Sequence, residues 1–573
     1  MRSYRYFLKS NDTKTTTSKN LSSIRKLIRK RMKCLKDIPP LIHNNSTILD
    51  DSEKCSIFSQ TFMDNFSSPQ ASTSPQQSVV SPSSANNPNA CKYLFEPYIV
   101  EQVLRKLTPK IGFSLNYVNF YILKHCATPL ALPLSLIFTQ SFEEAILPDA
   151  WKHATVLPIP KKGNPAIPSN YRPISLTDHI ARVMEKVICS RIRIDYRHLI
   201  SPHQHGFLDY RSCTTSLARS TSLYHEILKQ HNSLDVLFFD FSKAFDQVSH
   251  IKLIEKLEHI GIHSNYTRWF ESFLTNRSFS LKVNSITSTQ KYSVPSGVPQ
   301  GTVSGPLLFI LFINDLLHSI PPTVHFSCFA DDIKLFGHSP SELQAAIDLI
   351  ANWSKDNQLP LAPAKTALLQ LGKKNSKNVY TVDNITVSPT NSVRDLGLYT
   401  DSKLTFQPHI NRATSLALLR AKQILKCFSS SSPKFYISMY KTYVSPILEY
   451  GSVIYSPPPT SKLSSTLESP LKYFSKRVLQ RCNIKYKIKN ATQTHNAFSK
   501  SYENRLKILG ISSARSLRLR AQLLLLYKIL TGAAHFPKSS DFVTLANSSR
   551  RPMLIKIKNP KCRSFFSQVV PIW

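Results

Sequence analysis

Three aspartates in the middle of the chain follow apolar segments, at places where a strand should end. Asp240 comes directly after the apolar run 236–239, and Asp331 and Asp332 stand side by side between two β-rich segments. The run predicts a buried strand, and the adjacent pair predicts the tip of a hairpin. Carboxylates in such surroundings repel one another and lose hydration unless cations neutralise them. Magnesium prefers oxygen ligands, and a third carboxylate would allow two ions to act together on a phosphoryl transfer.

An isolated Asp-Asp pair is more often an exposed turn, and that alternative stays open for Asp331 and Asp332 taken alone. A glycine-rich segment between the two acidic sites favours a functional role. Gly297, Gly301 and Gly305 fall within nine residues of a chain that has only 13 glycines. Such clustering indicates backbone that another group approaches closely, although a simple Gly-Pro turn would also explain it.

Charge and composition narrow the classes of function. The 573 residues include 73 Lys and Arg against 35 Asp and Glu, a formal net charge of +38, which favours a polyanionic partner such as nucleic acid. No apolar run approaches the roughly 18 residues of a membrane span, so no membrane partner is expected. The ten cysteines are scattered without zinc spacing, which predicts a reduced intracellular compartment and no structural zinc.

The positive charge is concentrated at the two ends of the chain. Residues 1–40 carry a net charge of +10 and residues 471–573 a net charge of +19, whereas the centre is nearer to balance. This distribution is typical of an enzyme core flanked by segments that bind a polyanion, although a basic run can also be a solvated helix face.

The order of the acidic and glycine-rich segments resembles motifs A, B and C of reverse transcriptases, especially those of non-LTR (LINE-type) retrotransposons. Motif A is similar in 240–246, motif B in 297–301 and motif C in 329–332. The resemblance covers roughly residues 95–460, and its further matches are Trp151-Lys152, 158–163, 170–176, 204–207, Arg211-Ser212, Trp269-Phe270, Arg277, Lys365-Thr366 for motif D and Leu396-Gly397 for motif E.

This resemblance implies an α+β fold of the right-hand polymerase type, with fingers, palm and thumb and a basic helical C-terminal extension. The expected divisions are a basic N-terminal segment (1–66), a Ser/Pro-rich linker (67–90), fingers and palm (91–390), primer grip and thumb (391–470) and a basic helical C-terminal region (471–573).

The resemblance also implies the roles of the site residues. Asp240, Asp331 and Asp332 are expected to be catalytic and to hold two Mg²⁺ ions, which Mn²⁺ could replace. The ions would activate the primer 3′-hydroxyl and stabilise the leaving pyrophosphate. Arg172 is expected to bind the incoming triphosphate as a planar fork, with Lys161 and Lys162 as weaker candidates.

Further residues are expected around the nucleotide and the primer. Gln300 and Gly301 would line the nucleotide and template pocket, and Leu396 with Gly397 would form the primer grip. The ring of Phe245 would lie under the sugar and exclude a 2′-hydroxyl, or it would simply pack in the core. Lys365 would donate a proton to pyrophosphate, with a solvated loop lysine as the alternative.

The expected function is RNA-directed DNA polymerisation, a nucleotidyl transfer from dNTPs to a primer, with an RNA template and a DNA primer or target as partners. The alternative is a catalytically silent, retrotransposon-derived protein that binds nucleic acid. A telomerase or group II intron enzyme is a third possibility, disfavoured by 244–246 and 329–330. Copying at a nicked target would place the protein in the nucleus.

Two peripheral segments depart from the family pattern. Residues 107–116 lack Gly-Pro-Asp, and 208–210 replace the usual Arg-x-Gly. Only about 95 residues precede the fingers, without the acidic and histidine set of an endonuclease, and no zinc knuckle or ribonuclease H-like set follows. The expectation is the polymerase part of a larger element, unable to transpose autonomously.

Overall fold

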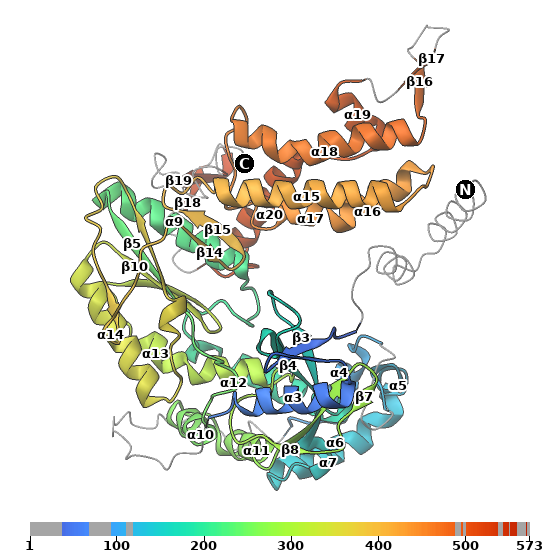
Figure 1. Ribbon diagram of the computed structural model, residues 1–573. Helices are drawn as coiled ribbons and strands as arrows, with labels where there is room; N and C mark the ends of the chain where they lie inside the picture. Colours follow the sequence, from blue (N-terminus) through green and yellow to red (C-terminus); the bar gives the residue numbers. More distant parts are fainter. Residues whose placement is uncertain are drawn as a thin grey trace.

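The computed structural model describes residues 37–67, 93–109, 118–487, 494–496, 500–536, 543–548, 551–557 and 569 (Figure 1). The basic cluster 25–31 lies outside these ranges, and so does nearly all of the expected linker, 67–90. Within the described ranges the chain forms an arc in Figure 1, with one sheet and its helices at the left, a second sheet at the lower right and a group of long helices above.

The palm is a four-stranded antiparallel sheet in the order β11-β5-β10-β9. Its strands are β5 (Leu234–Phe239), β9 (His325–Phe329), β10 (Asp332–Gly337) and β11 (Ala367–Leu371).

Side chains of β5 alternate between two hydrophobic cores, as the period of a strand requires. Val236 packs in a cluster with Tyr224 of α9 (Cys213–His231), while Leu237 and Phe239 belong to the large core shared with α12 (Gly305–Phe312) and α14 (Pro340–Asp356). Helices on both faces therefore bury the strand that carries Asp240 at its end, and they fix that end in place.

The fingers are built on a five-stranded sheet in which β3 (His153–Pro160) pairs antiparallel with β4 (Tyr171–Leu176) and parallel with β6 (Ser278–Val283). The short strands β7 (Ile286–Thr287) and β8 (Tyr292–Ser293) pair with β6. The remaining helices of the fingers and palm are α4 (Pro97–Arg105), α5 (Phe120–His125), α6 (Ala127–Glu143), α7 (Asp149–Lys152), α8 (His179–Asp195), α10 (His250–His259), α11 (Ser264–Leu274) and α13 (Asn314–Ser319).

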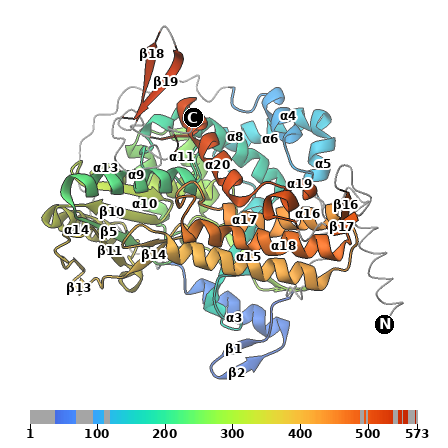
Figure 2. The same ribbon diagram turned by 90° about the horizontal axis from the view of Figure 1, so that it is seen from above.

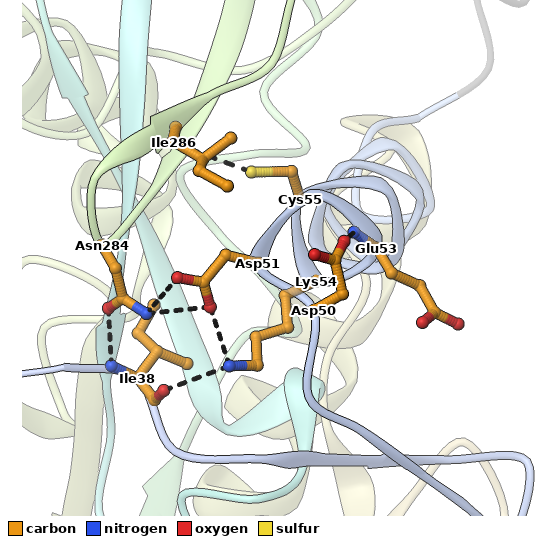
Figure 3. A network of polar contacts seen from close by, with 8 residues as sticks. All are labelled: Ile38, Asp50, Asp51, Glu53, Lys54, Cys55, Asn284 and Ile286. Atoms are coloured by element: carbon orange, nitrogen blue, oxygen red, sulfur yellow. Dashed lines mark hydrogen bonds and ion pairs between the residues drawn. The ribbon is translucent and has the colours of Figure 1, made fainter.

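The described part of the N-terminal segment docks on the finger sheet through β1 (Leu41–His43), β2 (Ser46–Ile48) and α3 (Asp51–Met63). Figure 3 shows the contact: Asn284 donates from Nδ2 to both carboxylate oxygens of Asp51 and accepts at Oδ1 from the backbone N–H of Ile38. Lys54 also binds Asp51, and these contacts hold the pKa of Asp51 below its usual range. This segment is thus part of the fingers in the folded chain.

The thumb begins with the hairpin of β14 (Ser392–Asp395) and β15 (Leu398–Asp401) and continues as a helical bundle (Figure 2). Its helices are α15 (Gln407–Cys427), α16 (Pro433–Tyr443), α17 (Ser445–Glu449), α18 (Lys462–Arg481), α19 (Tyr502–Leu509) and α20 (Ala514–Leu530). The remaining short strands are β12 (Thr381–Val382), β13 (Ile385–Thr386), β16 (Lys485–Lys487), β17 (Thr494–Asn496), β18 (Val543–Ser548) and β19 (Arg551–Ile557).

One expected division does not match the structure. A boundary between residues 470 and 471 falls inside α18, and one hydrophobic core joins α15 and α18 to α20. The prediction followed the rise in positive charge, which lies on the surface, whereas apolar packing continues across it. The right-hand polymerase fold itself is confirmed. No helix in the described residues is long and apolar enough to cross a membrane.

Candidate active site

Strand register brings the predicted carboxylates together. Ile333 of β10 pairs with Phe239 of β5 in the antiparallel ladder. One step further along both strands, Asp332 comes opposite Asp240. Residues 92 positions apart in sequence therefore meet at one edge of the palm because two apolar strands pair in one register.

Asp331 sits in the two-residue turn that joins β9 to β10. Phe329 and Asp332 form the last pair of the hairpin, and Ala330 occupies the left-handed region with φ 58°. Ala330 is buried at 3 % exposure, which leaves the turn little room to move.

The surroundings of this turn are electrostatically unfavourable for negative charge. Burial raises the pKa of Asp331, and the carboxylate of Asp240 raises it further. Loss of hydration and the charges of Asp331 and Asp240 raise the pKa of Asp332 to about 7. In the described part of the chain, no three acidic, histidine or cysteine side chains form a ready-made metal centre. The carboxylates are close enough to repel one another and still need a counter-charge.

Lys365 supplies part of that counter-charge. Its Nζ lies 2.7 Å from Oδ2 of Asp240, and both side chains remain partly exposed. Lys365 ends a short 3-10 turn (Pro363–Lys365) just before β11. The backbone N–H of Ala362, directly before this turn, donates to the carbonyl of Asp240 at 2.8 Å and so holds the turn beside the carboxylate.

A cleft of about 670 Å³, counted with the space open to solvent, connects the carboxylates with the predicted primer grip. Asp240, Asp332 and Lys365 line it together with Leu396. Leu396 and Gly397 form the tip of the β14–β15 hairpin with positive φ values of 44° and 90°.

Two contacts hold the β14–β15 hairpin in place, one from Tyr450 at the end of α17 in the thumb and one from the palm. Tyr450 donates a hydrogen bond from its hydroxyl to the carbonyl of Leu396. The buried ion pair between Lys334 Nζ and Asp395 Oδ2, at 2.6 Å, ties β14 to the motif C strand. The structure thus places Leu396 in the same cleft as Asp240 and Asp332, with Gly397 next to it at the tip of the hairpin.

The glycine-rich loop links the palm to the fingers. Its Gln300 donates from Nε2 to Oδ1 of Asp246 at 2.8 Å and accepts at its carbonyl from the backbone N–H of Ser175 in β4. A Cβ at Gly301 would lie 2.8 Å from the carbonyl oxygen of Ser175, and one at Gly297 would lie 2.6 Å from that of Asp246. These glycines are therefore required by close backbone approach, as the sequence predicted.

Phe245 has the surroundings of a ring that is held in place at the edge of a pocket. It stacks on Phe309 of α12 with ring centroids 4.6 Å apart, and Phe207 packs against it edge-to-face with ring centroids 6.2 Å apart. Phe245 is half-buried, so part of the ring remains open. These contacts are compatible both with packing of Phe245 in the core and with its expected exclusion of a 2′-hydroxyl.

The finger cations divide into two groups. The positive charges of Arg172 and Lys365 partly offset the raised pKa of Asp331, so both face the carboxylates. Partial burial and the positive charge of Arg172 lower the pKa of Lys161, and the negative charge of Asp246 partly offsets this lowering. A slight loss of hydration and the charges of Arg394 and Arg412 lower the pKa of Lys162. Lys161 therefore belongs with Arg172, whereas Lys162 faces the thumb side.

Two residues of the site were not singled out from the sequence. Asp246, buried beneath the glycine-rich loop, has its pKa raised to about 6 by burial, even though Gln300 and Lys161 favour its charged form. Glu185 of α8 is fully buried, and its Oε2 accepts from the backbone N–H groups of Val303 and Ser304 at 2.9 and 2.8 Å.

Glu185 thereby stabilises the start of α12, directly after the glycine-rich loop. Asp246 is the last residue of the motif A match 240–246, so the sequence did carry a visible signal for it. Nothing in the local sequence marks Glu185, because its partners lie 118 and 119 positions away.

The chain matches the family model described as reverse transcriptase (RNA-dependent DNA polymerase) over residues 159–399, which contain every strand of the palm. It also resembles curated proteins of non-LTR retrotransposons. The chain contains a reverse transcriptase domain of the non-LTR type.

Two relatives of this reverse transcriptase come from Drosophila melanogaster. The probable RNA-directed DNA polymerase from transposon BS is 28% identical over 388 residues, which cover 63% of this chain and 42% of that protein. The RNA-directed DNA polymerase from mobile element jockey is 27% identical over 341 residues, or 56% of this chain and 37% of the relative. The chain thus spans about two fifths of the length of these curated relatives.

Among solved structures, the reverse transcriptase is similar to telomerase from Candida albicans in complex with a fragment of telomeric RNA. That likeness has a TM-score of 0.35 and 12% identity, and it covers 67% of this chain and 71% of the telomerase chain.

Proposed function

We propose that the chain is an RNA-directed DNA polymerase that adds deoxynucleotides to a primer 3′-hydroxyl. The observation that carries this proposal is the meeting of Asp240 and Asp332, with Asp331 in the adjoining turn, at the edge of the palm. Asp240 and Asp332 line a cleft that also contains Leu396, the expected primer-grip residue. Enzymes of this family use divalent metal ions, and the three carboxylates fit that requirement. Their oxygens are hard ligands that suit such ions. The raised pKa values of Asp331 and Asp332 indicate that nearby cations of the protein do not fully neutralise the negative charges of these carboxylates.

Asp240, Asp331 and Asp332 would hold the two ions, Mg²⁺ in the first place and Mn²⁺ as a substitute. When bound, such ions lower the pKa of the attacking hydroxyl and neutralise charge on the leaving oxygens. The chain's own cations act on the other end of the nucleotide. Arg172 and Lys161 would bind the triphosphate, and Lys365 would pass from Asp240 to a phosphate oxygen once cations occupy the site.

The remaining side chains would select and orient the substrates. Gln300 is held by Asp246 beside Phe245, so an amide and an aromatic edge border the space for the base and the sugar. An aromatic ring under the sugar would favour dNTPs by excluding a 2′-hydroxyl. Leu396 and Gly397 would position the end of a DNA primer, and the positive charge of the chain favours an RNA template as the second partner.

The alternative is a silent nucleic-acid-binding protein. The maintained geometry of the carboxylates, the glycine-rich loop and the buried Asp246–Gln300 contact favours the enzyme, because binding alone requires none of them.

Extension of an oligo(dT) primer on poly(rA) with dTTP and Mg²⁺ tests the proposal, beside Asp331→Ala and an RNA-binding assay on both proteins. We expect extension by the wild-type chain only, with similar RNA binding by both. Folded wild-type protein that binds RNA without extending the primer would support the silent alternative.

A further inference from the structure

A segment outside the palm sheet runs beside the strand that leads to the catalytic turn. Gln204 forms a parallel β-bridge with Cys328 of β9. The backbone N–H of His205 donates to the carbonyl of Cys328 at 2.7 Å, and the N–H of Cys328 donates to the carbonyl of His203 at 3.0 Å. The segment 203–206 therefore extends the palm by one short, irregular strand, directly behind motif C.

The side chain of Gln204 reaches from this segment to the catalytic turn itself. Its Oε1 accepts from the backbone N–H of Ala330 at 2.8 Å and from that of Gly206 at 2.8 Å. Its Nε2 donates to Sγ of Cys328 at 3.1 Å and lies 3.4 Å from the carbonyl oxygen of Ala330. A reversed amide would place N–H against N–H at two positions, so the orientation is fixed by its partners.

The turn is also tightly packed against the Gln204 segment. Gln204 is fully buried, and a Cβ at Gly206 would lie 2.6 Å from the backbone nitrogen of Ala330. The Gln204 segment is itself anchored, because Arg211 donates to the carbonyls of Ser201 and Gln204. The side-chain amide of Gln204 is therefore held in place when it binds Ala330, the turn residue with positive φ.

We propose that Gln204 is a positioning residue of the polymerase centre: its buried amide fixes the Ala330–Asp331 turn and so aligns Asp331 and Asp332 with Asp240. This inference rests on the proposed polymerase function. Gln204 does not touch substrate or metal in this arrangement. It acts through the backbone of Ala330, one residue before the first motif C aspartate.

The geometry separates this role from general stabilisation. Backbone contacts with β9 already hold the segment, and the side chain of Gln204 adds bonds only to Ala330 in the turn, to Cys328 near the end of β9 and to Gly206. Loss of the amide would leave the N–H groups of Ala330 and Gly206 buried and unpaired, which favours a rearranged turn. A variant whose carboxylates are displaced by less than an ångström would still bind nucleic acid, but its carboxylates would hold the metal ions poorly.

The palm offers a matched control. Gln344 of α14 accepts at Oε1 from the N–H of Thr381 at 3.1 Å and donates from Nε2 to the carbonyl of Thr381 at 3.0 Å. It binds one residue's N–H and C=O as Gln204 does, at a place remote from the carboxylates. Methionine is a suitable replacement at both positions because it preserves volume without hydrogen bonds.

We expect Gln204→Met to lower kcat about 10- to 100-fold, as loss of a residue that orients metal ligands does, with little change in the KM for dTTP. Gln344→Met should keep the wild-type kcat. Hydrogen exchange of a peptide covering 325–333 should accelerate only in Gln204→Met. A wild-type kcat in Gln204→Met, or an equal loss in Gln344→Met, would overturn the inference.

Mn²⁺ titration of the same proteins separates the two proposals. If the wild-type chain does not extend a primer, the polymerase proposal fails on its own. The positioning role is then decided by metal affinity: weaker Mn²⁺ binding by Gln204→Met than by Gln344→Met supports it, and equal binding rejects it.

Discussion

Lys365 approaches Asp240 from the short 3-10 turn that precedes β11, with its Nζ 2.7 Å from the carboxylate oxygen Oδ2. In this arrangement the ammonium group of Lys365 partly neutralises a carboxylate that otherwise faces two other aspartates. The two charges are both partly exposed, so their attraction is modest and reversible. A contact of this kind would allow Lys365 to hold the carboxylate until metal ions bind, and then to turn to a phosphate, as the proposed function requires.

The first prediction concerns this competition. Lys365→Ala should bind Mn²⁺ more tightly than the wild-type chain in the absence of nucleotide, by up to about fivefold, because an exposed ion pair contributes no more than about 1 kcal/mol. Primer extension by the variant should nevertheless be slower. Calorimetric titration measures the affinity, and Lys355→Ala, which removes an ion pair with Asp383 remote from the cleft, is the control. Weaker Mn²⁺ binding by Lys365→Ala would exclude the competition.

The second prediction concerns the pH dependence of metal binding. Because the pKa of Asp332 is raised to about 7, this side chain is mostly protonated below neutral pH and must release its proton before it can bind a cation. Affinity for Mg²⁺ should therefore fall as the pH decreases from 8 to about 6 and level off above pH 8. Titration at several pH values measures the slope. Asp332→Asn should bind more weakly and show a flatter dependence; an unchanged slope would assign the proton to another group.

The sequence predicted the elements of this site better than its contacts. Apolar runs ending in aspartates predicted both the strand before Asp240 and the hairpin before Asp332, since burial and period leave a visible pattern. The pairing register that brings these residues together has no such local signal. For the same reason, the bonds of Lys365 to Asp240 and of Gln300 to Asp246 appear only in the folded chain.

The thumb shows that charge composition alone does not locate a domain boundary. The division expected at residue 470 followed charge, but charge describes the solvent face of a helix and not its packing. Leu467 and Leu471 of α18 are both buried in the same core, on either side of that point.

The third prediction uses Asp246, whose pKa is raised by burial from its ordinary 3.8 to about 6. The folded state holds this proton more tightly than the unfolded state, so the free energy of unfolding should fall as the pH rises from about 4 to about 6. At neutral pH the cost is up to about 3 kcal/mol, at 1.36 kcal/mol for each pKa unit. Asp246→Asn keeps an acceptor for Gln300 and removes this cost.

Urea unfolding at pH 4 and pH 7.5 measures the effect. Asp246→Asn should be more stable than the wild-type chain at pH 7.5, and the difference should be close to zero at pH 4. Asp356→Asn, at the exposed end of α14, should differ little from wild type at either pH. An Asp246→Asn variant that is less stable at pH 7.5 would show that the carboxylate is stabilised by its neighbours in the folded state.

The fourth prediction tests the ring of Phe245 as a sugar gate. The ring is held by Phe309 at a centroid distance of 4.6 Å and borders the same pocket as Gln300. Phe245→Val should reduce the preference for dTTP over UTP by about 10- to 100-fold, because the space for a 2′-hydroxyl opens while the base and phosphate contacts remain. Single-nucleotide addition with each substrate, compared as kcat/KM, gives the ratio.

Phe309→Leu is the matched control for this gate. It removes the stacking partner of Phe245 but leaves the Phe245 ring itself beside the sugar, so its sugar preference should stay close to that of the wild-type chain even if its stability falls. If Phe245→Val kept the wild-type ratio, the ring would be a packing residue alone. If Phe309→Leu lost selectivity as fully as Phe245→Val, the gate would depend on the stack of both rings, and α12 would have to be counted as part of the nucleotide pocket.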